Sequence, residues 1–339
     1  MTASASGGSS SASTAPPKTS PPPSGTPDTA SPSPSPSPPS VGHDAWVAVS
    51  VATIWRSPRA PRHVDAPALT NPVAIRTWLS GLGTTARRGL VGRADTQALL
   101  GDRVHLTAVS GRFAKVVVPD QRTPLDPRGY PGWVPLVQLS ATAPPPATTS
   151  ATVVSRTAWL HDDDTAGRRA MEVSFGTRLP VLGSVGAMTR LGLPGGRVLR
   201  APAADVSVTE RGAAALPPEG AGLVRSARMF VGLPYLWAGT SGFGVDCSGL
   251  TWLVHRVHGV VIPRDAAPQA DAGVAVGVDA LRPGDLLFYA VDGEVHHVSV
   301  YAGGGQMVHA PSTGHTVEVI AVSAADFASQ LSGARRFLR

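Results

Sequence analysis

The spacing of apolar and polar residues divides the chain into a long polar stretch and three segments able to bury a core. Residues 1–42 are almost entirely Ser, Pro, Thr, Ala and Gly and include the run SPSPSPSPPS. Such a composition offers too little apolar surface to offset the conformational entropy lost on folding. We therefore expect a disordered, partly extended linker over residues 1–42.

The first folded segment, residues 43–141, consists mainly of short strand-like pieces separated by Gly, Pro and Asp. Alternation of apolar and polar residues is typical of strands with one buried face. The segment predicts a small all-β barrel with an insertion at about residues 59–100, in which a helix is expected near 74–82. The strand-like pieces are AWVAVSVATIW (45–55), RVHLTAVSG (103–111), FAKVVVPDQ (113–121) and GYPGWVPLVQL (129–139).

A second set of strand-like pieces follows the linker APPPATTS at 143–150. These pieces lie within residues 151–206 and predict a second small barrel. Both segments show the same order of strand, glycine turn, strand and short final strand, which indicates a weak internal repeat.

The third segment, residues 217–339, places helices before strands. The stretch GAGLVRSARMFV at 220–231 has apolar residues at helical spacing, and a second helix is expected to begin at Cys247. Helices followed by an antiparallel sheet form an α+β arrangement. The strand-like pieces lie at 284–291, 296–304, 306–311 and 316–322.

Composition and charge restrict the classes of function. One cysteine among 339 residues excludes an intrachain disulfide and a thiolate zinc cluster. A net charge of +6 suits association with anionic polymers or surfaces, but the basic residues form no dense run with interleaved aromatics, so nucleic acid is not an expected partner.

The expected location of the protein rests on composition. No stretch of about 18 apolar residues is present, so no membrane span is expected. The first residues resemble no signal peptide. Because Ser/Pro-rich tethers commonly join an anchor to a domain outside the cell, we expect an extracytoplasmic protein whose leader is absent from this sequence; a cytoplasmic protein is the alternative.

Cys247 is the candidate nucleophile. It lies in an Asp-Cys-Ser-Gly turn that leads into the apolar run of the expected helix. The positive end of a helix dipole favours the thiolate, which is the form that attacks carbonyl carbon. The alternative is that this cysteine is a small buried apolar side chain.

Two histidines complete a candidate site. His297 begins one strand-like piece and His309 ends the next, so adjacent antiparallel strands would bring both imidazoles to one face. A cysteine nucleophile needs such a base, and the base needs an orienting group. His296 is expected on the opposite face. His255, His258 and His315 are interpreted as structural or surface residues, and no metal or other cofactor is expected.

The motifs of the third segment, in this order and spacing, resemble the NlpC-type cysteine peptidases of bacterial cell walls. The resemblance covers residues 218–339. It implies a papain-like core with Cys247 as nucleophile, His297 as general base and acid, and His309 as orienting residue. The motifs are LPYLWAGTSGFGVDCSGL (233–250), PRD with Gln269 (263–269), RPGDLLFY (282–289), HVSVYAG (297–303) and MVHAP (307–311).

The resemblance also implies residues that bind substrate. Tyr235 and Asp246 match positions that line the amino-terminal side of short wall peptides, and Ser248 would add a hydrogen bond. Asp246 either pairs with a free L-alanyl ammonium or caps the helix, and both roles are compatible. Two barrels before the catalytic domain resemble the bacterial SH3-like arrangement of γ-D-glutamyl-L-diamino-acid endopeptidases. There the first barrel narrows the cleft, which makes Tyr130 a candidate wall of the site; a barrel-turn aromatic is its alternative.

Other residues of the motifs change this interpretation little. Arg264 also occupies a family position, but structural pairing with an acid or a loop carbonyl is its preferred interpretation. The sequence departs from the commoner family pattern with WAG at 237–239 and HVS at 297–299. Neither departure removes a catalytic group.

Together these features predict a peptidoglycan hydrolase that cleaves the bond between γ-D-glutamate and diaminopimelate or lysine in stem peptides with a free N-terminal L-alanine. Thiolate attack would give a thioester acyl-enzyme, which water then hydrolyses. Two alternatives stay open: a wall-binding SH3-like protein whose third domain is a scaffold, and an amidase or acyltransferase with the same Cys–His chemistry. The diamino acid and the oligomeric state are not determined by the sequence.

Overall fold

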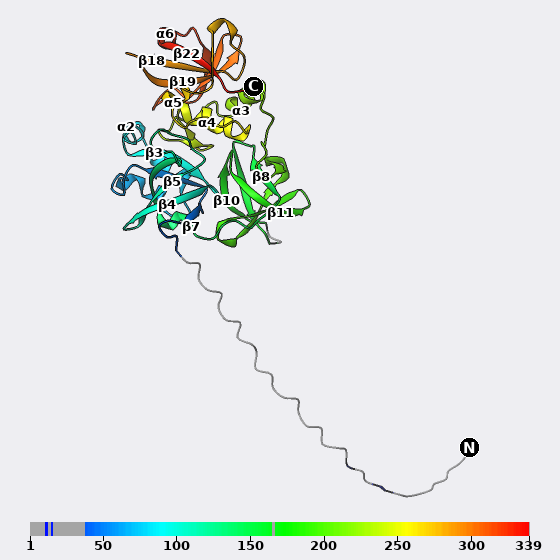
Figure 1. Cartoon of the computed structure of the whole chain (residues 1–339). Helices are drawn as coiled ribbons and strands as arrows, with labels where there is room; N and C mark the ends of the chain where they lie inside the picture. Colours follow the sequence, from blue (N-terminus) through cyan, green and yellow to red (C-terminus); the bar gives the residue numbers. More distant parts are fainter. Residues whose placement is uncertain (1–10, 13–14, 16–37, 165–166, 339) are drawn as a thin grey trace, which may run out of the picture. The chain divides into compact units, whose positions relative to one another are not determined.

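The computed structural model describes residues 11–12, 15, 38–164 and 167–338 (Figure 1). The chain separates into two units, Met1–Ser35 and Pro36–Arg339, and the following description concerns the second. The linker expected over residues 1–42 lies almost entirely outside the described residues and stays a prediction.

The first sheet contains seven antiparallel strands in the order β3-β2-β6-β5-β4-β1-β7. The alternating stretch at 45–55, expected to be one strand, is two strands because its halves pair with different neighbours: β1 with β4 and β7, β2 with β3 and β6. The strands are β1 (Asp44–Val47), β2 (Val51–Trp55), β3 (Ala94–Leu99), β4 (Arg103–Ser110), β5 (Phe113–Val118), β6 (Tyr130–Pro135) and β7 (Leu139–Ser140), with a short 3-10 turn η2 (Leu136–Gln138) before the last.

Three short helices fill the insertion between β2 and β3. They are η1 (His63–Leu69), α1 (Ile75–Gly81) and α2 (Thr84–Arg88). The expected helix near 74–82 is therefore confirmed, whereas β3, inside the range expected to be insertion, belongs to the sheet. The buried carboxylate of Asp65 accepts hydrogen bonds from Arg62 Nε at 2.8 Å and Trp78 Nε1 at 3.0 Å, which ties η1 to α1.

The second sheet repeats the first in strand order, β10-β9-β13-β12-β11-β8-β14. Subtracting seven from each label gives 3-2-6-5-4-1-7, the order of the first sheet, so the internal repeat expected from the sequence is present in the topology. The elements are β8 (Thr149–Val153), β9 (Thr157–Asp162), β10 (Arg169–Ser174), β11 (Arg178–Val185), β12 (Met188–Gly192), η3 (Pro194–Gly196), β13 (Val198–Pro202), η4 (Ala203–Asp205) and β14 (Val206–Glu210).

The third segment is an α+β unit, as expected. Its six-stranded antiparallel sheet has the order β17-β22-β18-β19-β20-β21, and the strands β17 and β22 were not anticipated from the sequence. The elements are α3 (Gly220–Arg228), β15 (Thr240–Ser241), β16 (Gly244–Val245), α4 (Cys247–Val257), α5 (Ala266–Ala270), β17 (Val274–Val276), η5 (Val278–Ala280), β18 (Leu286–Val291), β19 (Glu294–Gly303), β20 (Gln306–His309), β21 (Glu318–Ala321), α6 (Ala325–Ala328) and β22 (Leu331–Arg336).

Helix α4 begins and ends at recognisable sequence signals. Asp246 caps its first turn by accepting a 2.6 Å hydrogen bond from the backbone N–H of Gly249. A side chain at Gly249 would collide with the carbonyl oxygen of Gly239, so only glycine fits there. The helix ends before Gly259, whose positive φ of 71° suits glycine. These signals place Cys247 at the first helical residue.

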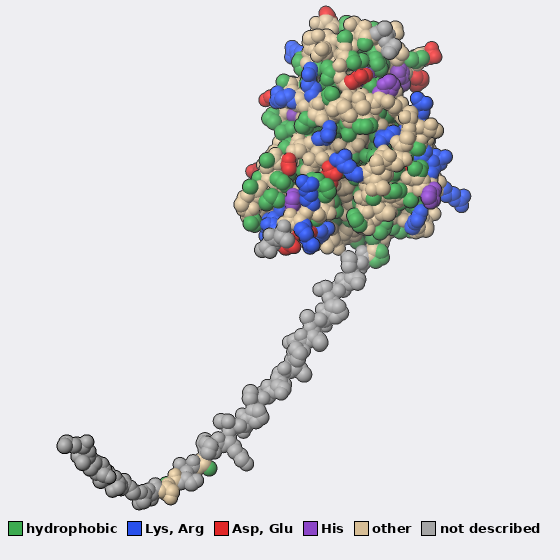
Figure 2. Space-filling model, turned by 180° about the vertical axis from the view of Figure 1, so that it is seen from behind, with side chains coloured by type: hydrophobic (Ala, Val, Ile, Leu, Met, Phe, Trp, Pro, Cys, Tyr) green, Lys and Arg blue, Asp and Glu red, His purple; other side chains and the backbone are tan. Residues whose placement is uncertain are grey.

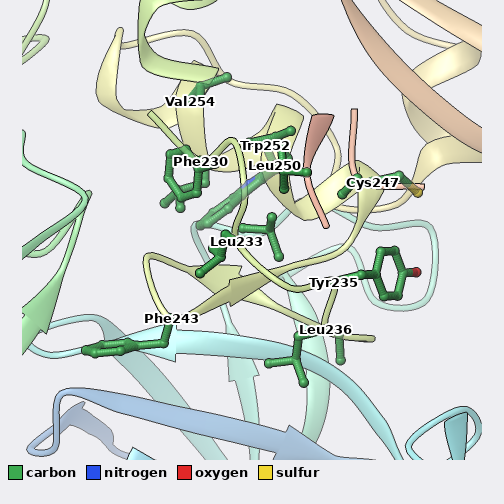
Figure 3. Close-up of a cluster of buried hydrophobic side chains, with 14 of the residues drawn as sticks. Phe230, Leu233, Tyr235, Leu236, Phe243, Cys247, Leu250, Trp252 and Val254 are labelled. Carbon is green, nitrogen blue, oxygen red and sulfur yellow. The ribbon is translucent and has the colours of Figure 1, made fainter. Parts of the chain in front are cut away.

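The main hydrophobic core is continuous through the three segments. It contains Trp55 and Trp78 of the first segment, Phe175 of the second, and Phe230 and much of α4 of the third. Edge-to-face contacts join Trp55 to Trp78 at 6.2 Å and Phe175 to Phe230 at 5.7 Å between ring centroids. Figure 3 shows the part of this core around α4. The position of Cys247 therefore depends on packing with both barrel-like segments.

Hydrogen bonds also join β3 to the loop before α4. Gln97 Oε1 accepts from the backbone N–H of Thr240 at 3.1 Å and from Ser241 Oγ at 3.0 Å. The indole N–H of Trp237 donates to the carbonyl of Ala94 at 2.8 Å. The first sheet therefore holds the backbone that leads to Cys247.

Positive side chains are spread over the face of the unit shown in Figure 2 rather than gathered in one band. Within the described part of the chain, each helix is too short or too polar to cross a membrane.

Candidate active site

Cys247 lies at the start of α4, next to strand β19. The backbone N–H groups of Val298 and Ser248 act to lower the pKa of its thiol. The side chain is almost fully buried, with 9% of the residue exposed. Figure 3 shows its sulfur and the ring of Tyr235 directed to the same side of the cluster. Helix α4, which begins with Cys247, packs against the strand that carries His297.

The structure brings His297 and His309 together. His297 Nε2 and His309 Nδ1 are 2.9 Å apart, and both side chains are buried. His296 is exposed, and its Nε2 lies 2.8 Å from Gln330 Oε1. The opposite face expected for His296 is not confirmed: His297 pairs with Tyr289 but Val295 with Ala290, so the strand is irregular here, and the rings of His296 and His297 lie 6.4 Å apart. The two histidines differ in burial, because His297 is buried and His296 is exposed.

The remaining histidines of α4 have structural contacts. His255 Nδ1 lies 2.7 Å from the carbonyl oxygen of Thr251. His258 contacts Ser226 Oγ at 3.0 Å and the carbonyl of Pro217. Both are buried in α4 packing, as the sequence indicated.

The expectation that the helix end favours a thiolate is not met. Burial, followed by the negative charge of Asp246, raises the pKa of the Cys247 thiol to about 12 despite the two backbone N–H donors. Burial, with the neighbouring His309 and His296, lowers the pKa of His297 to about 3. Both shifts favour a neutral thiol and a neutral imidazole in the free protein.

This protonation state predicts how Cys247 reacts with iodoacetamide. Because the thiolate fraction of a thiol with a pKa near 12 grows about tenfold per pH unit, the alkylation rate should rise continuously between pH 6 and pH 10. The single cysteine makes incorporated label a direct measure of Cys247. A rate that is constant from pH 5 to pH 8 would instead indicate a preformed thiolate–imidazolium pair.

Asp246, Ser248 and Arg264 form a buried polar cluster beside the nucleophile. Arg264 donates to both carboxylate oxygens of Asp246, at 3.1 and 2.8 Å, and to Ser248 Oγ at 2.9 Å. It also donates to Thr96 Oγ1 of β3 at 2.9 Å. Arg264 is 1% exposed, and although burial acts to lower its pKa, Asp246 and Asp265 raise it. The structural interpretation of Arg264 is confirmed, and Asp246 is the helix cap.

Tyr130, from the first sheet, reaches the catalytic segment. Its hydroxyl donates to Asp265 Oδ2 at 3.1 Å, and burial, followed by Asp265, raises its pKa. Asp265 Oδ1 lies 3.8 Å from Arg264 Nη1, and burial raises the pKa of Asp265. Tyr235 is 6% exposed, and burial and the neighbouring Cys247 raise its pKa. Tyr130 is therefore more than an aromatic residue at a turn of the first barrel, because its hydroxyl also bonds to Asp265 of the third segment.

Comparison with known proteins identifies the family. Residues 232–336 match the model of the NlpC/P60 family, and residues 153–208 match that of the YKFC SH3b2 domain. A γ-D-glutamyl-L-lysine dipeptidyl-peptidase of Bacillus cereus is 38% identical over 302 residues, covering 87% of this chain and 91% of that protein. The chain belongs to the NlpC/P60 family.

Two further comparisons agree with this assignment. A γ-D-glutamyl-L-lysine dipeptidyl-peptidase of Bacillus subtilis is 36% identical, over 86% of this chain and 97% of that protein. The crystal structure of an NlpC/P60 family protein from Bacillus cereus covers 87% of this chain and all of its own, with a TM-score of 0.83 and 37% identity. The predicted fold class is confirmed, and this NlpC/P60 protein is a cysteine peptidase.

Two acidic residues of the site were missed from the sequence. Asp265 lay within the PRD motif, but nothing in the chain near it indicated the hydroxyl of Tyr130, 135 residues away. Glu318 contacts His309 Nε2 at 3.2 Å and lies at the start of a strand-like piece. Glu318 lies opposite His309 in the pairing of β20 with β21. A prediction of this strand pairing from the sequence could therefore have identified it.

Proposed function

We propose that this NlpC/P60 protein cleaves the γ-D-glutamyl bond to a diamino acid in short wall peptides that have a free N-terminal L-alanine. The proposal is carried by the acidic cluster beside the nucleophile. Asp246 and Asp265 flank a single guanidinium, that of Arg264, so two carboxyl groups oppose one fixed positive charge. The positive charge of Arg264 balances only one of the two carboxylates. The ammonium of an unblocked peptide would balance the other.

The first sheet supports the same selectivity. Tyr130 hydrogen bonds to Asp265, so the first sheet contributes a wall to this side of the site. A wall at this place suits a peptide that has only two residues on the amino-terminal side of the cleaved bond. It disfavours a longer peptide or a stem that is still linked to a glycan. Relatives that cover most of the chain are named γ-D-glutamyl-L-lysine dipeptidyl-peptidases, which agrees with release of a dipeptide.

The proposed chemistry uses Cys247, His297 and His309. Cys247 attacks the γ-carbonyl of D-glutamate while His297 takes the thiol proton. The carbonyl electron pair moves to oxygen, held by the backbone N–H of Cys247, and returns as the amide C–N bond breaks. His297 gives its proton to the leaving amine. Water then hydrolyses the thioester with His297 again as base, and His309 orients His297. Tyr235 and Ser248 line the site.

A digest with defined peptides tests the substrate. We expect release of L-Ala-D-Glu from L-Ala-γ-D-Glu-diaminopimelate or its lysine analogue, and a fall of at least about 100-fold in kcat/KM when the alanine is N-acetylated, because the buried carboxylates then lose their cation. Mass spectrometry of the products gives both rates. Equal cleavage of free and acetylated peptide would remove the amine requirement.

A matched pair of variants assigns the amine to the acidic cluster. Asp265→Asn should raise KM for the free peptide and reduce the preference over the acetylated one. Asp271→Asn, at the exposed far end of α5, removes the same charge and should leave both unchanged. Cleavage of neither peptide, with binding to purified sacculi, would favour the wall-binding alternative.

We also propose an extracytoplasmic location, because a wall peptide is the substrate and the Ser/Pro-rich stretch at 1–42 has the composition of a tether. Soluble muropeptides, rather than intact sacculi, are the proposed substrate.

A further inference from the structure

Glu318 extends the line of hydrogen-bonding groups that begins at His297. It is the first residue of β21 and lies directly opposite His309 in the pairing of β20 with β21. Glu318 Oε1 is 3.2 Å from His309 Nε2, and His309 Nδ1 is 2.9 Å from His297 Nε2. The four atoms connect the partly exposed carboxylate of Glu318 to the buried imidazole of His297.

The carboxylate of Glu318 determines which atom is the donor in each of these hydrogen bonds, because a carboxylate accepts hydrogen bonds and donates none. His309 Nε2 must then carry the hydrogen that Glu318 accepts. In a neutral imidazole the other nitrogen has a lone pair, so His309 Nδ1 accepts from His297 Nε2. His297 Nε2 therefore carries its hydrogen, and His297 Nδ1 is left with a lone pair.

We propose that Glu318 is a positioning residue that fixes the tautomers of His309 and His297, so that His297 Nδ1 is free to take the proton of Cys247. The inference rests on the proposed roles of Cys247, His297 and His309. The S–H proton moves to Nδ1 as the S–C bond forms, and it leaves on the amine nitrogen when the C–N bond breaks. The two hydrogens held along the line stay in place throughout.

The surroundings of the two imidazoles support neutral rings with few other partners. Phe327 packs on both, with centroid distances of 5.2 Å to His297 and 4.9 Å to His309. Burial lowers the pKa of His309, against the attraction of Glu318. The other titratable groups that act on the pair are His296, which lowers the pKa of His297, and His315, which lowers that of His309.

Without Glu318 the opposite proton order becomes available. His309 could then carry its hydrogen on Nδ1 and donate to His297 Nε2, which leaves the hydrogen of His297 on Nδ1. A thiol facing an N–H donor has no base. Glu318 is 44% exposed, so water can partly replace it, and the loss should be smaller than that caused by removing either histidine.

The test compares Glu318→Ala with Glu294→Ala, which removes an exposed glutamate at the start of β19. Glu318→Asp keeps a carboxylate. We expect kcat to fall about tenfold in Glu318→Ala with KM unchanged, partial recovery in Glu318→Asp, and no change in Glu294→Ala. Histidine-selective 15N NMR should show single tautomers of His297 and His309 in the wild type and mixed tautomers in Glu318→Ala.

Two results would overturn the inference: a Glu318→Ala variant with unchanged kcat, or one whose kcat falls while both tautomers stay as in the wild type, since the effect would then be merely structural. If the wild type cleaves neither peptide, the proposed substrate fails, and the NMR spectra still decide the proton order independently of turnover.

Discussion

Replacing Cys247 with alanine is expected to reduce kcat by at least about 10⁴-fold, to the limit of detection, because the thioester cannot form without the sulfur. The substitution removes one buried sulfur atom and leaves the Asp246 cap of α4 intact. The melting temperature should therefore change little. Mass spectrometry of the released L-Ala-D-Glu measures kcat, and circular dichroism measures the melting temperature. Full activity in this variant would exclude the cysteine mechanism.

The neighbouring histidines provide a matched control for the same mechanism. His297→Ala should abolish turnover as Cys247→Ala does, because His297 is the proposed acceptor of the thiol proton. His296→Ala should retain activity, because His296 is exposed and contacts Gln330 rather than His309. Equal loss in both variants would point to a disturbed strand rather than to a missing base.

Replacing Arg264 with methionine is expected to cause the largest loss of stability. The change leaves the Asp246 carboxylate, 7% exposed, without its cation, and removing one partner of a buried ion pair costs about 3–5 kcal/mol. For a unit of this size we expect the melting temperature to fall by roughly 10 °C, measured by differential scanning calorimetry. Activity should fall as well, because Asp246 caps the helix that begins with Cys247.

Two further variants separate charge from packing. Arg128→Met breaks an ion pair with Asp126 on the surface and should leave the melting temperature unchanged. Adding Asp246→Asn to Arg264→Met removes the unpaired charge and should recover part of the loss. A melting temperature of Arg264→Met equal to that of the wild type would show that the pair contributes nothing to stability.

The periodicity of the sequence anticipated much of the fold because each segment carries local signals. Turns rich in glycine separated the strand-like pieces, and an acidic cap followed by an apolar run marked the start of α4. Strand alternation predicted opposite faces for His296 and His297, but irregular pairing of β18 with β19 leaves their rings 6.4 Å apart. Strands β17 and β22 were not predicted because apolar and polar residues alternate little along these short stretches.

Long-range pairing decided the rest of the site. Glu318 reaches His309 through strand register, and Tyr130 reaches Asp265 across two segments of the chain. The protonation state of Cys247 also depended on tertiary structure, because burial and Asp246 outweigh the helix end that the local sequence indicated. By itself, then, the sequence indicated the candidate nucleophile, the two candidate histidines and most of the order of elements, because these depend on local patterns. The tertiary structure decided the acidic cluster, the direction of the histidine line and the neutral resting state, because each arises from groups that folding alone brings together.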